Sequence, residues 1–295
     1  PRYSPRVFHR LKYSSSEPGA ILCDSLQDNG KVGSLTHLPP LLPLLEINHV
    51  NYAYHSMQGE TPALQNIHFT VCQGDFIAVV GPSGCGKSTL LSLIAGLLAP
   101  EEGEILLNGK RIQEHSNNPI GYMLQKDHLL EWRTIWKNIQ LGLEIQGNIN
   151  SASTAYANSL LKNYGLYEFK DKRPSELSGG MRQRAALIRT LVLNPMLLLL
   201  DEPFSALDYQ TRLKVADDIG TIIKQEEKTA ILVTHDLSEA VSLANRVIVL
   251  SERPAQIATV VPLEFKESLT PFERRAAPQF KDYFNIIWKE LNHDE

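Results

Sequence analysis

The sequence has few cysteines and no long apolar run. Only 3 of its 295 residues are cysteine, and no two of them form a Cys-x-x-Cys pair, which argues against a zinc site. The two longest apolar runs, 38–45 and 196–200, fall well short of the ~20 residues that a membrane-spanning helix needs. We therefore expect no membrane span, and any link with a membrane should pass through a partner.

An excess of positive charge is also missing. The 29 lysines and arginines are outnumbered by 33 aspartates and glutamates, so the formal net charge is -4. A nucleic-acid-binding domain normally presents a basic face, and we therefore expect no nucleic-acid partner. With 43% hydrophobic residues, a chain of this length can bury a sizeable core without disulfide bonds.

Residues 1–43 show no periodic apolar face. Two clusters of turn-forming residues, at 14–19 and 28–30, interrupt them. We expect a poorly structured N-terminal extension here and assign it no function.

Beyond this extension, apolar residues recur with the spacing of strands and helices. Residues 45–50 alternate like a half-buried strand, and 75–80 form a tight apolar run that ends in a glycine-rich turn. Residues 197–200 are a continuous apolar run, as in a strand buried on both faces of a parallel sheet. Helical spacing covers 87–98 and most of 134–191. The order strand, helix, helical insert, strand, helix, strand predicts an α/β core with a helical subdomain between its halves.

A glycine-rich stretch between an apolar strand and a helix matches the P-loop pattern G-x-x-x-x-G-K-[ST] at every fixed position. Its glycines let backbone N–H groups turn toward phosphate oxygens, and the N-terminus of the helix favours negative charge. Lys87 supplies a cation for the phosphates, and Ser88 offers a hydroxyl to Mg²⁺. The alternative, a glycine-rich turn with a surface lysine, leaves the flanking strand and helix unexplained. The predicted nucleotide-binding residues here are Gly81, Pro82, Ser83, Gly84, Cys85, Gly86, Lys87, Ser88 and Thr89.

Two carboxylates follow the apolar run 197–200. Asp201 and Glu202 stand at the C-terminal end of that strand, where open α/β sheets bind their ligands. Asp201 can hold Mg²⁺ directly or through water, and Glu202 can polarise an attacking water as a general base. The alternative is a strand end that happens to be acidic, which the four leucines before Asp-Glu-Pro argue against.

The segment 177–184, Leu-Ser-Gly-Gly-Met-Arg-Gln-Arg, resembles the signature sequence of ABC ATPases. It lies between the P-loop and the acidic pair, as in that family, and it opens a helix, which makes it a second anion site. The resemblance implies a head-to-tail homodimer in which Ser178, Gly179 and Gly180 cover the ATP of the partner subunit. A helix N-cap with flexible glycines is the alternative.

Four further residues match the motifs of this family in order. Tyr54 matches the aromatic residue that stacks on adenine, with Tyr52 as the alternative. Gln125 matches the glutamine that joins the core to the helical subdomain, and Asp208 matches the loop that crosses to the second subunit. His235 matches the switch histidine that contacts the γ-phosphate. The implied catalytic residues are Glu202, His235 and Lys87, and the implied metal ligands are Ser88, Gln125 and Asp201.

The resemblance covers residues 44–260 and implies an ATP- and Mg²⁺-binding cassette. Its expected fold is α/β: a RecA-like P-loop NTPase core with an antiparallel β subdomain and a helical signature subdomain at about 126–190. Residues 261–295 are expected to form a tail with a short amphipathic helix that packs onto the core. The apolar face of that helix would carry Phe280, Phe284, Ile287, Trp288 and Leu291.

The segment 127–139 resembles the stretch after the glutamine in ATPases of nitrate, sulfonate and taurine importers, with Glu131 in place of the usual proline. The sequence from Arg253, Arg-Pro-Ala-Gln-Ile, departs from the expected Pro-Gly-Arg-Ile. The resemblance implies a peripheral subunit on the cytoplasmic face of the plasma (inner) membrane. Its partners would be a second copy, permease subunits and, indirectly, a solute-binding protein.

Four other readings compete with an importer. Soluble ABC proteins of ribosomes usually carry two cassettes with a charged linker, and those of DNA repair carry long coiled coils, neither of which is found in the sequence. A P-loop kinase leaves the signature and His235 unexplained. An exporter ATPase is the nearest alternative, and the segment 127–139 argues against it. The sequence leaves the solute open.

Overall fold

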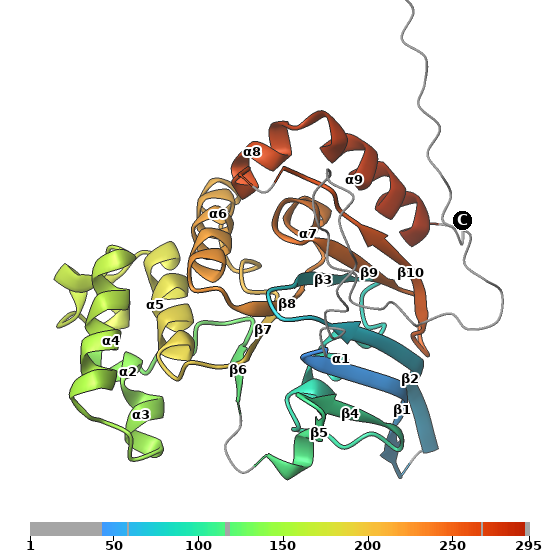
Figure 1. Ribbon diagram of the computed structural model, residues 1–295, viewed down its shortest axis with the longest axis horizontal. Helices are drawn as coiled ribbons and strands as arrows, with labels where there is room; N and C mark the ends of the chain where they lie inside the picture. Colours follow the sequence, from blue (N-terminus) through green and yellow to red (C-terminus); the bar gives the residue numbers. More distant parts are fainter. Residues whose placement is uncertain (1–42, 58, 116–118, 267, 293–295) are drawn as a thin grey trace, which may run out of the picture.

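The computed structural model describes residues 43–57, 59–115, 119–266 and 268–292, so the expectation for the N-terminal extension lies almost wholly outside it. The first of two sheets is antiparallel and four-stranded, in the order β2-β1-β4-β5 (Figure 1). Its strands are β1 (Leu45–Ser56), β2 (Gly59–Val71), β4 (Glu102–Leu107) and β5 (Lys110–Arg111). This sheet is the antiparallel subdomain expected from the sequence.

The second sheet forms the core and has the order β10-β9-β3-β8-β7-β6. Its strands are parallel except for β10, which pairs antiparallel with β9 at the edge. Sequence analysis did not predict β6 and β10, because one is four residues long and contains a glycine and the other is an exposed edge strand. The six strands are β3 (Phe76–Val80), β6 (Ile120–Met123), β7 (Leu197–Asp201), β8 (Thr229–Val233), β9 (Arg246–Leu250) and β10 (Ile257–Pro262).

Helices cover both faces of the core sheet, which explains its continuous apolar strands. Side chains alternate across a strand, so Leu197 and Leu199 pack toward α1 (Lys87–Ile94) and the antiparallel sheet, while Leu198 and Leu200 pack toward the opposite helices. Helix α1 is shorter than expected because Gly96 has φ 73°, a left-handed conformation that ends a helix. A 3-10 turn, Ile112–Glu114, follows β5.

A helical subdomain lies beside the core and meets it through α5 and α6 (Tyr209–Gln225) (Figure 1). A second link is polar: the hydroxyls of Tyr156 and Tyr164 donate to the two carboxylate oxygens of Glu226, at 2.9 and 2.5 Å. This arrangement matches the expected insert. Its elements are α2 (Ile135–Ile139), α3 (Leu141–Ile145), α4 (Ser151–Asn163), α5 (Gly179–Leu191) and two 3-10 turns, Tyr167–Phe169 and Pro174–Glu176.

The remaining helices are α7 (Leu237–Leu243), α8 (Pro271–Ala276) and α9 (Pro278–Leu291). Helix α9 is the expected amphipathic helix, and it packs beside α7 on the core, with Ile287 fully buried. Trp288 stacks on Phe284 along this side of the helix, but it is 55% exposed at the outer edge of the contact. None of the helices in the described part of the chain combines the length and apolar character needed to span a membrane.

Candidate nucleotide-binding site

The P-loop joins β3 to α1, and its geometry requires glycine. Gly86 has φ 128°, and a Cβ there would come within 2.8 Å of the Leu64 side chain. The first turn of α1 has neither a side-chain cap nor an acidic residue. Within the described residues, no capping side chain therefore competes with an anion for the backbone N–H donors of this turn.

Lys87 projects back into this loop. The side chain is 8% exposed, and Nζ donates to the carbonyl oxygens of Gly81 and Pro82, each at 2.8 Å. The neighbouring thiol of Cys85 is also buried, and burial raises its pKa, so it stays protonated at neutral pH. The positive charge thus sits at the centre of the loop, as the phosphate-binding prediction requires.

Ser88 and Asp201 lie together beside the loop. Ser88 Oγ donates to one carboxylate oxygen of Asp201 at 3.2 Å, and Tyr122 of β6 donates to the other at 3.3 Å. Burial raises the pKa of Asp201, and the adjacent charge of Glu202 acts in the same direction. Burial, together with the charge of Asp201, raises the pKa of Tyr122 to about 12.

This donor set fits Mg²⁺, which prefers hard oxygen ligands and usually keeps water and phosphate oxygens in its shell. Among the described residues, no group of three or more His, Cys, Asp or Glu side chains is placed to hold a metal alone. Sequence analysis missed Tyr122, since a tyrosine in an unpredicted short strand carries no recognisable signal.

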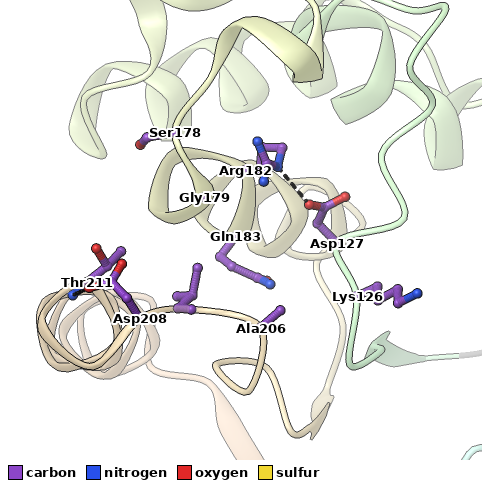
Figure 2. Close-up of a pocket in the computed structure, with 10 residues that line it drawn as sticks. Lys126, Asp127, Ser178, Gly179, Arg182, Gln183, Ala206, Asp208 and Thr211 are labelled. Carbon is purple, nitrogen blue, oxygen red and sulfur yellow. Dashed lines mark hydrogen bonds and ion pairs between the residues drawn. The ribbon is translucent and has the colours of Figure 1, made fainter.

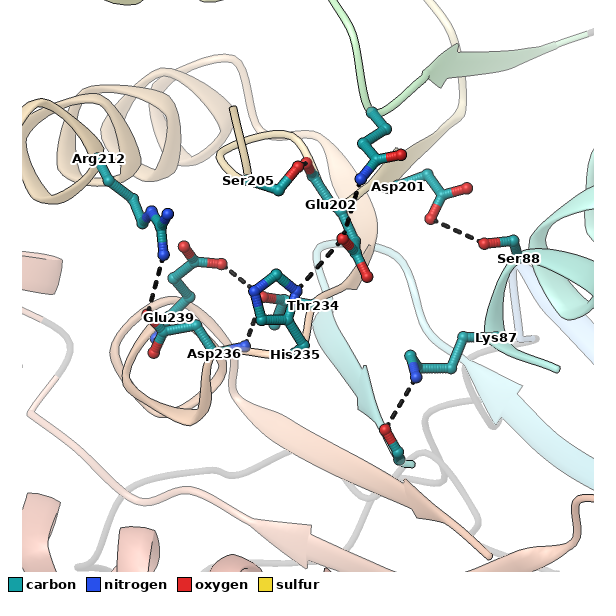
Figure 3. Close-up of polar contacts among 12 residues, drawn as sticks. Lys87, Ser88, Asp201, Glu202, Ser205, Arg212, Thr234, His235, Asp236 and Glu239 are labelled. Carbon is teal, nitrogen blue, oxygen red and sulfur yellow. Dashed lines mark hydrogen bonds and ion pairs between the residues drawn. The ribbon is translucent and has the colours of Figure 1, made fainter. Parts of the chain in front are cut away.

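Two other predicted residues contact the carboxylate of Glu202, and Figure 3 shows one of them, His235, pointing at it. His235 Nδ1 lies 3.2 Å from Oε2, and Gln125 Nε2 donates to the same oxygen at 3.3 Å. The meeting follows from the sheet, because β7 and β8 are adjacent parallel strands that end side by side. Glu202 itself has φ 44°, an uncommon conformation that turns the chain sharply out of β7.

Tyr54 lies at the far end of β1 and is tied to the P-loop helix. Its hydroxyl is hydrogen-bonded to Thr89 Oγ1 at 2.9 Å, and its side chain is 42% exposed. The ring of Tyr52 meets it edge-on at 5.1 Å and packs against the core. The exposed ring of Tyr54 is therefore better placed than Tyr52 to receive a base.

The signature residues lie elsewhere, in a pocket of about 540 Å³ that no P-loop residue lines (Figure 2). Ser178 caps α5 by accepting from Met181 N at 3.4 Å, and Asp208 caps α6 by accepting from Thr211 N at 3.1 Å. Gly179 lies close to Leu207, so that a Cβ there would come within 2.9 Å of the end of the leucine side chain. Gly180 is buried at the first turn of α5. Within one chain, the signature residues therefore do not face the P-loop.

A buried carboxyl that sequence analysis missed lies behind His235. Glu239 of α7 is 4% exposed, and its Oε2 accepts from Thr234 Oγ1 at 2.5 Å (Figure 3). Asp236 and Arg212 also face this region and form a long ion pair at 3.9 Å. Burial raises the pKa of Glu239 to about 7, because the charged form is poorly solvated there.

Glu239 should make stability fall as the pH rises. The folded protein holds its proton up to about pH 7, whereas the ordinary pKa is 4.5, so the folded state binds more protons between these values. Relative to Glu239→Gln, which cannot ionise, the wild type should lose up to ~3 kcal/mol between pH 5 and 8. Urea unfolding of both proteins across this range measures the difference. Parallel pH profiles would contradict the prediction.

The chain resembles known proteins over most of its length. A family model described as ABC transporter matches residues 64–205. The chain is 47% identical over 253 residues to YtlC, an uncharacterised ABC transporter ATP-binding protein of Bacillus subtilis, covering 85% of this chain and 96% of that protein. It is 39% identical over 258 residues to the aliphatic sulfonates import ATP-binding protein SsuB of Bacillus cereus, covering 84% and 99%.

Two solved structures share the fold. One is a dimeric post-hydrolysis state of the ATP-binding cassette MJ0796 bound to ADP and Pi, with a TM-score of 0.63, 28% identity and coverage of 75% of this chain and 100% of that chain. The other is cbiO1 of Clostridium perfringens, part of the ABC transporter complex cbiONQ, with a TM-score of 0.67, 25% identity and coverage of 85% and 98%. The chain belongs to the ATP-binding proteins of ABC transporters, and it is an ATPase.

Proposed function

We propose that this ATPase energises an importer and acts as a homodimer attached to permease subunits at the cytoplasmic face of the membrane. The observation that carries the proposal is the separation of two anion-binding surfaces in one chain. The P-loop lies at the start of α1, and the signature pocket with Ser178 and Gly179 is lined by none of its residues. A two-fold arrangement can bring the P-loop of each copy to the signature of the other.

The charges suit this arrangement. The N-terminus of α5 carries the partial positive charge of a helix start, and its first turn contains no acidic residue. Asp208 lies beside it, at the N-terminus of α6, where the copies would cross. The dimeric form of the MJ0796 cassette supports the same assembly for this chain.

Within each site, we assign roles from the positions of the side chains. Lys87 binds the phosphates, Tyr54 stacks on the adenine, and Gln125 senses the γ-phosphate region through Glu202. Mg²⁺, held by Ser88, Gln125 and Asp201, would neutralise phosphate charge when bound. Glu202 accepts a proton from the attacking water, and His235 orients that carboxylate and contacts the γ-phosphate.

A charge reversal at Ser178 tests the homodimer. Ser178→Asp keeps a residue that caps helices well but places a carboxylate where the partner's γ-phosphate should lie. We expect it to bind ATP as the wild type does, to stay monomeric with ATP and to lose ATPase activity. Ser178→Asn is the matched control, because asparagine caps equally well without charge and should dimerise. Analytical ultracentrifugation with ATP distinguishes them, and ATP-dependent dimers of Ser178→Asp would contradict the assembly.

The solute is proposed to be of the nitrate, sulfonate or taurine type. The segment 127–139 supports this, as does the 39% identity to the sulfonate-import protein SsuB. The segment is firmly held on α5: Arg182 pairs with Asp127 at 3.1 Å, and Arg189 donates to the carbonyls of Asp127 and His128 at 2.7 Å. Trp132, 74% exposed, is proposed to contact the permease.

Reconstitution tests the solute class. The ATPase, its permease and the solute-binding protein would be placed in liposomes, and ATP turnover would be measured with nitrate, an alkanesulfonate, taurine and an unrelated amino acid. We expect stimulation by one of the first three and no stimulation by the amino acid. Stimulation without the binding protein would contradict the proposed solute-binding partner, and stimulation by none of the first three solutes would contradict the solute class.

A further inference from the structure

An arginine outside the expected nucleotide motifs lies beside Tyr54. The turn between β9 and β10, residues 251–256, folds against β2 through two backbone hydrogen bonds. Ala255 N donates to Ala63 O, and Gln65 N donates to Ala255 O, both at 2.9 Å. Ala255 is fully buried, so the turn is anchored in the core. Arg253, two residues earlier, is therefore held close to the end of β2.

The guanidinium of Arg253 is fixed by backbone carbonyls. Its Nε donates to Pro62 O at 2.9 Å, and its Nη2 donates to Thr61 O at 3.4 Å. Thr61 is the cross-strand partner of Tyr54. The guanidinium thus arrives at the Tyr54 ring from the neighbouring strand, with its Cζ 5.7 Å from the ring centroid. This distance is within the range of an attractive cation–π contact.

Tyr54 is consequently held by three groups. Thr89 holds the hydroxyl, Tyr52 meets the ring edge-on, and Arg253 lies over the ring. Since the tyrosine is 42% exposed at a strand end, few core side chains restrict its rotation. Arg253 restricts the ring without depending on it, because its own hydrogen bonds go to β2.

We propose that Arg253 is a positioning residue for base recognition: it holds the Tyr54 ring in the orientation that stacks on the nucleotide base. This rests on the proposed role of Tyr54. Pre-orienting an aromatic ring lowers the entropy that binding must otherwise remove, so Arg253 increases affinity for nucleotides with a base and contributes nothing to phosphate binding. It also gives a role to the segment from Arg253, whose sequence departs from the expected pattern.

The test compares ATP with inorganic tripolyphosphate, which has the phosphates but no base. Arg253→Met keeps the length of the side chain and removes the charge and both hydrogen bonds. We expect it to weaken ATP binding about 2- to 5-fold, the effect of an exposed cation–π contact, with an unchanged kcat and unchanged tripolyphosphate affinity. Arg253→Lys keeps the positive charge but lacks the planar guanidinium, so its ATP affinity should lie between those of the wild type and Arg253→Met. Arg111→Met, at an exposed arginine of the antiparallel sheet that carries Tyr54, is the control and should change neither affinity.

A double-mutant cycle with Tyr54→Leu separates positioning from general stability. Tyr54→Leu should weaken ATP binding, and Arg253→Met should then add no further loss, because the ring it orients is gone. Additive losses, or equal losses for ATP and tripolyphosphate, would overturn the proposal. If Tyr54→Leu weakens ATP binding and Arg253→Met does not, only the inference about Arg253 fails. If Tyr54→Leu binds ATP as the wild type does, the proposed role of Tyr54 fails and the inference fails with it.

Discussion

Replacing Glu202 by glutamine is expected to lower ATP turnover by on the order of 10²–10⁴, the range for loss of a general base. Glutamine has nearly the same shape, and its amide can still meet Gln125 and His235, which now contact the carboxylate at 3.3 and 3.2 Å. It cannot accept a proton from water. ATP binding should therefore persist, and the ATP-loaded homodimer should accumulate.

Steady-state phosphate release and size-exclusion chromatography with ATP measure these two effects. Glu168→Gln, at an exposed carboxylate of the helical subdomain, is the matched control and should leave both unchanged. Unchanged turnover in Glu202→Gln would remove this residue from its proposed role. If the inactive protein stayed monomeric with ATP at high concentration, the shared site itself would be contradicted.

Replacing Lys87 by alanine should reduce ATP affinity by roughly 10²-fold or more, since hydrogen bonds to charged groups contribute about 1.5–3 kcal/mol each. Lys87 is 8% exposed and its ammonium lies within the loop, so no neighbouring cation in the described site can easily substitute for it. Isothermal titration with ATP measures the loss. The main effect of this substitution should be on ATP binding, whereas the Glu202 substitution should lower turnover and leave ATP binding intact.

Removing Lys87 also deletes two hydrogen bonds to the loop backbone, so folding has to be checked separately. Thermal unfolding of the nucleotide-free protein serves this purpose, with Lys110→Ala at an exposed position as the control. A folded Lys87→Ala protein with the ATP affinity of the wild type would contradict the phosphate-binding role of this loop.

Much of the candidate site could be predicted because its residues stand at fixed places in the sheet. The P-loop follows β3, and the two carboxylates lie at the end of β7. Both strands pair in parallel with β8, so their C-terminal ends lie at the same edge of the sheet. The signature residues were predictable as a motif, and the resemblance already implied that they cover the ATP of a partner subunit; in the structure they line a pocket that contains no P-loop residue. Asp201 and Ser88, both predicted metal ligands, lie 3.2 Å apart in the structure.

Other contributors depend on packing that local patterns do not encode. Tyr122 reaches Asp201 only because β6 pairs with β7, and Glu239 is buried only because α7 packs against the core. Arg253 reaches Tyr54 because its turn packs against β2, and these two segments are nearly two hundred residues apart in the sequence. Trp288 has the helical spacing of the apolar residues of α9, yet it lies outside the cluster that these residues form with the core and remains exposed.

The two tyrosines that share Glu226 have a mechanical consequence. Both phenols come from the α4 region and end on one carboxylate just beyond α6, so a shift that stretches one bond also pulls on the acceptor of the other. The α4 region of the helical subdomain is thereby tied to the core through both oxygens of one carboxylate. A turning motion that separated this region from the end of α6 would have to lengthen both hydrogen bonds together.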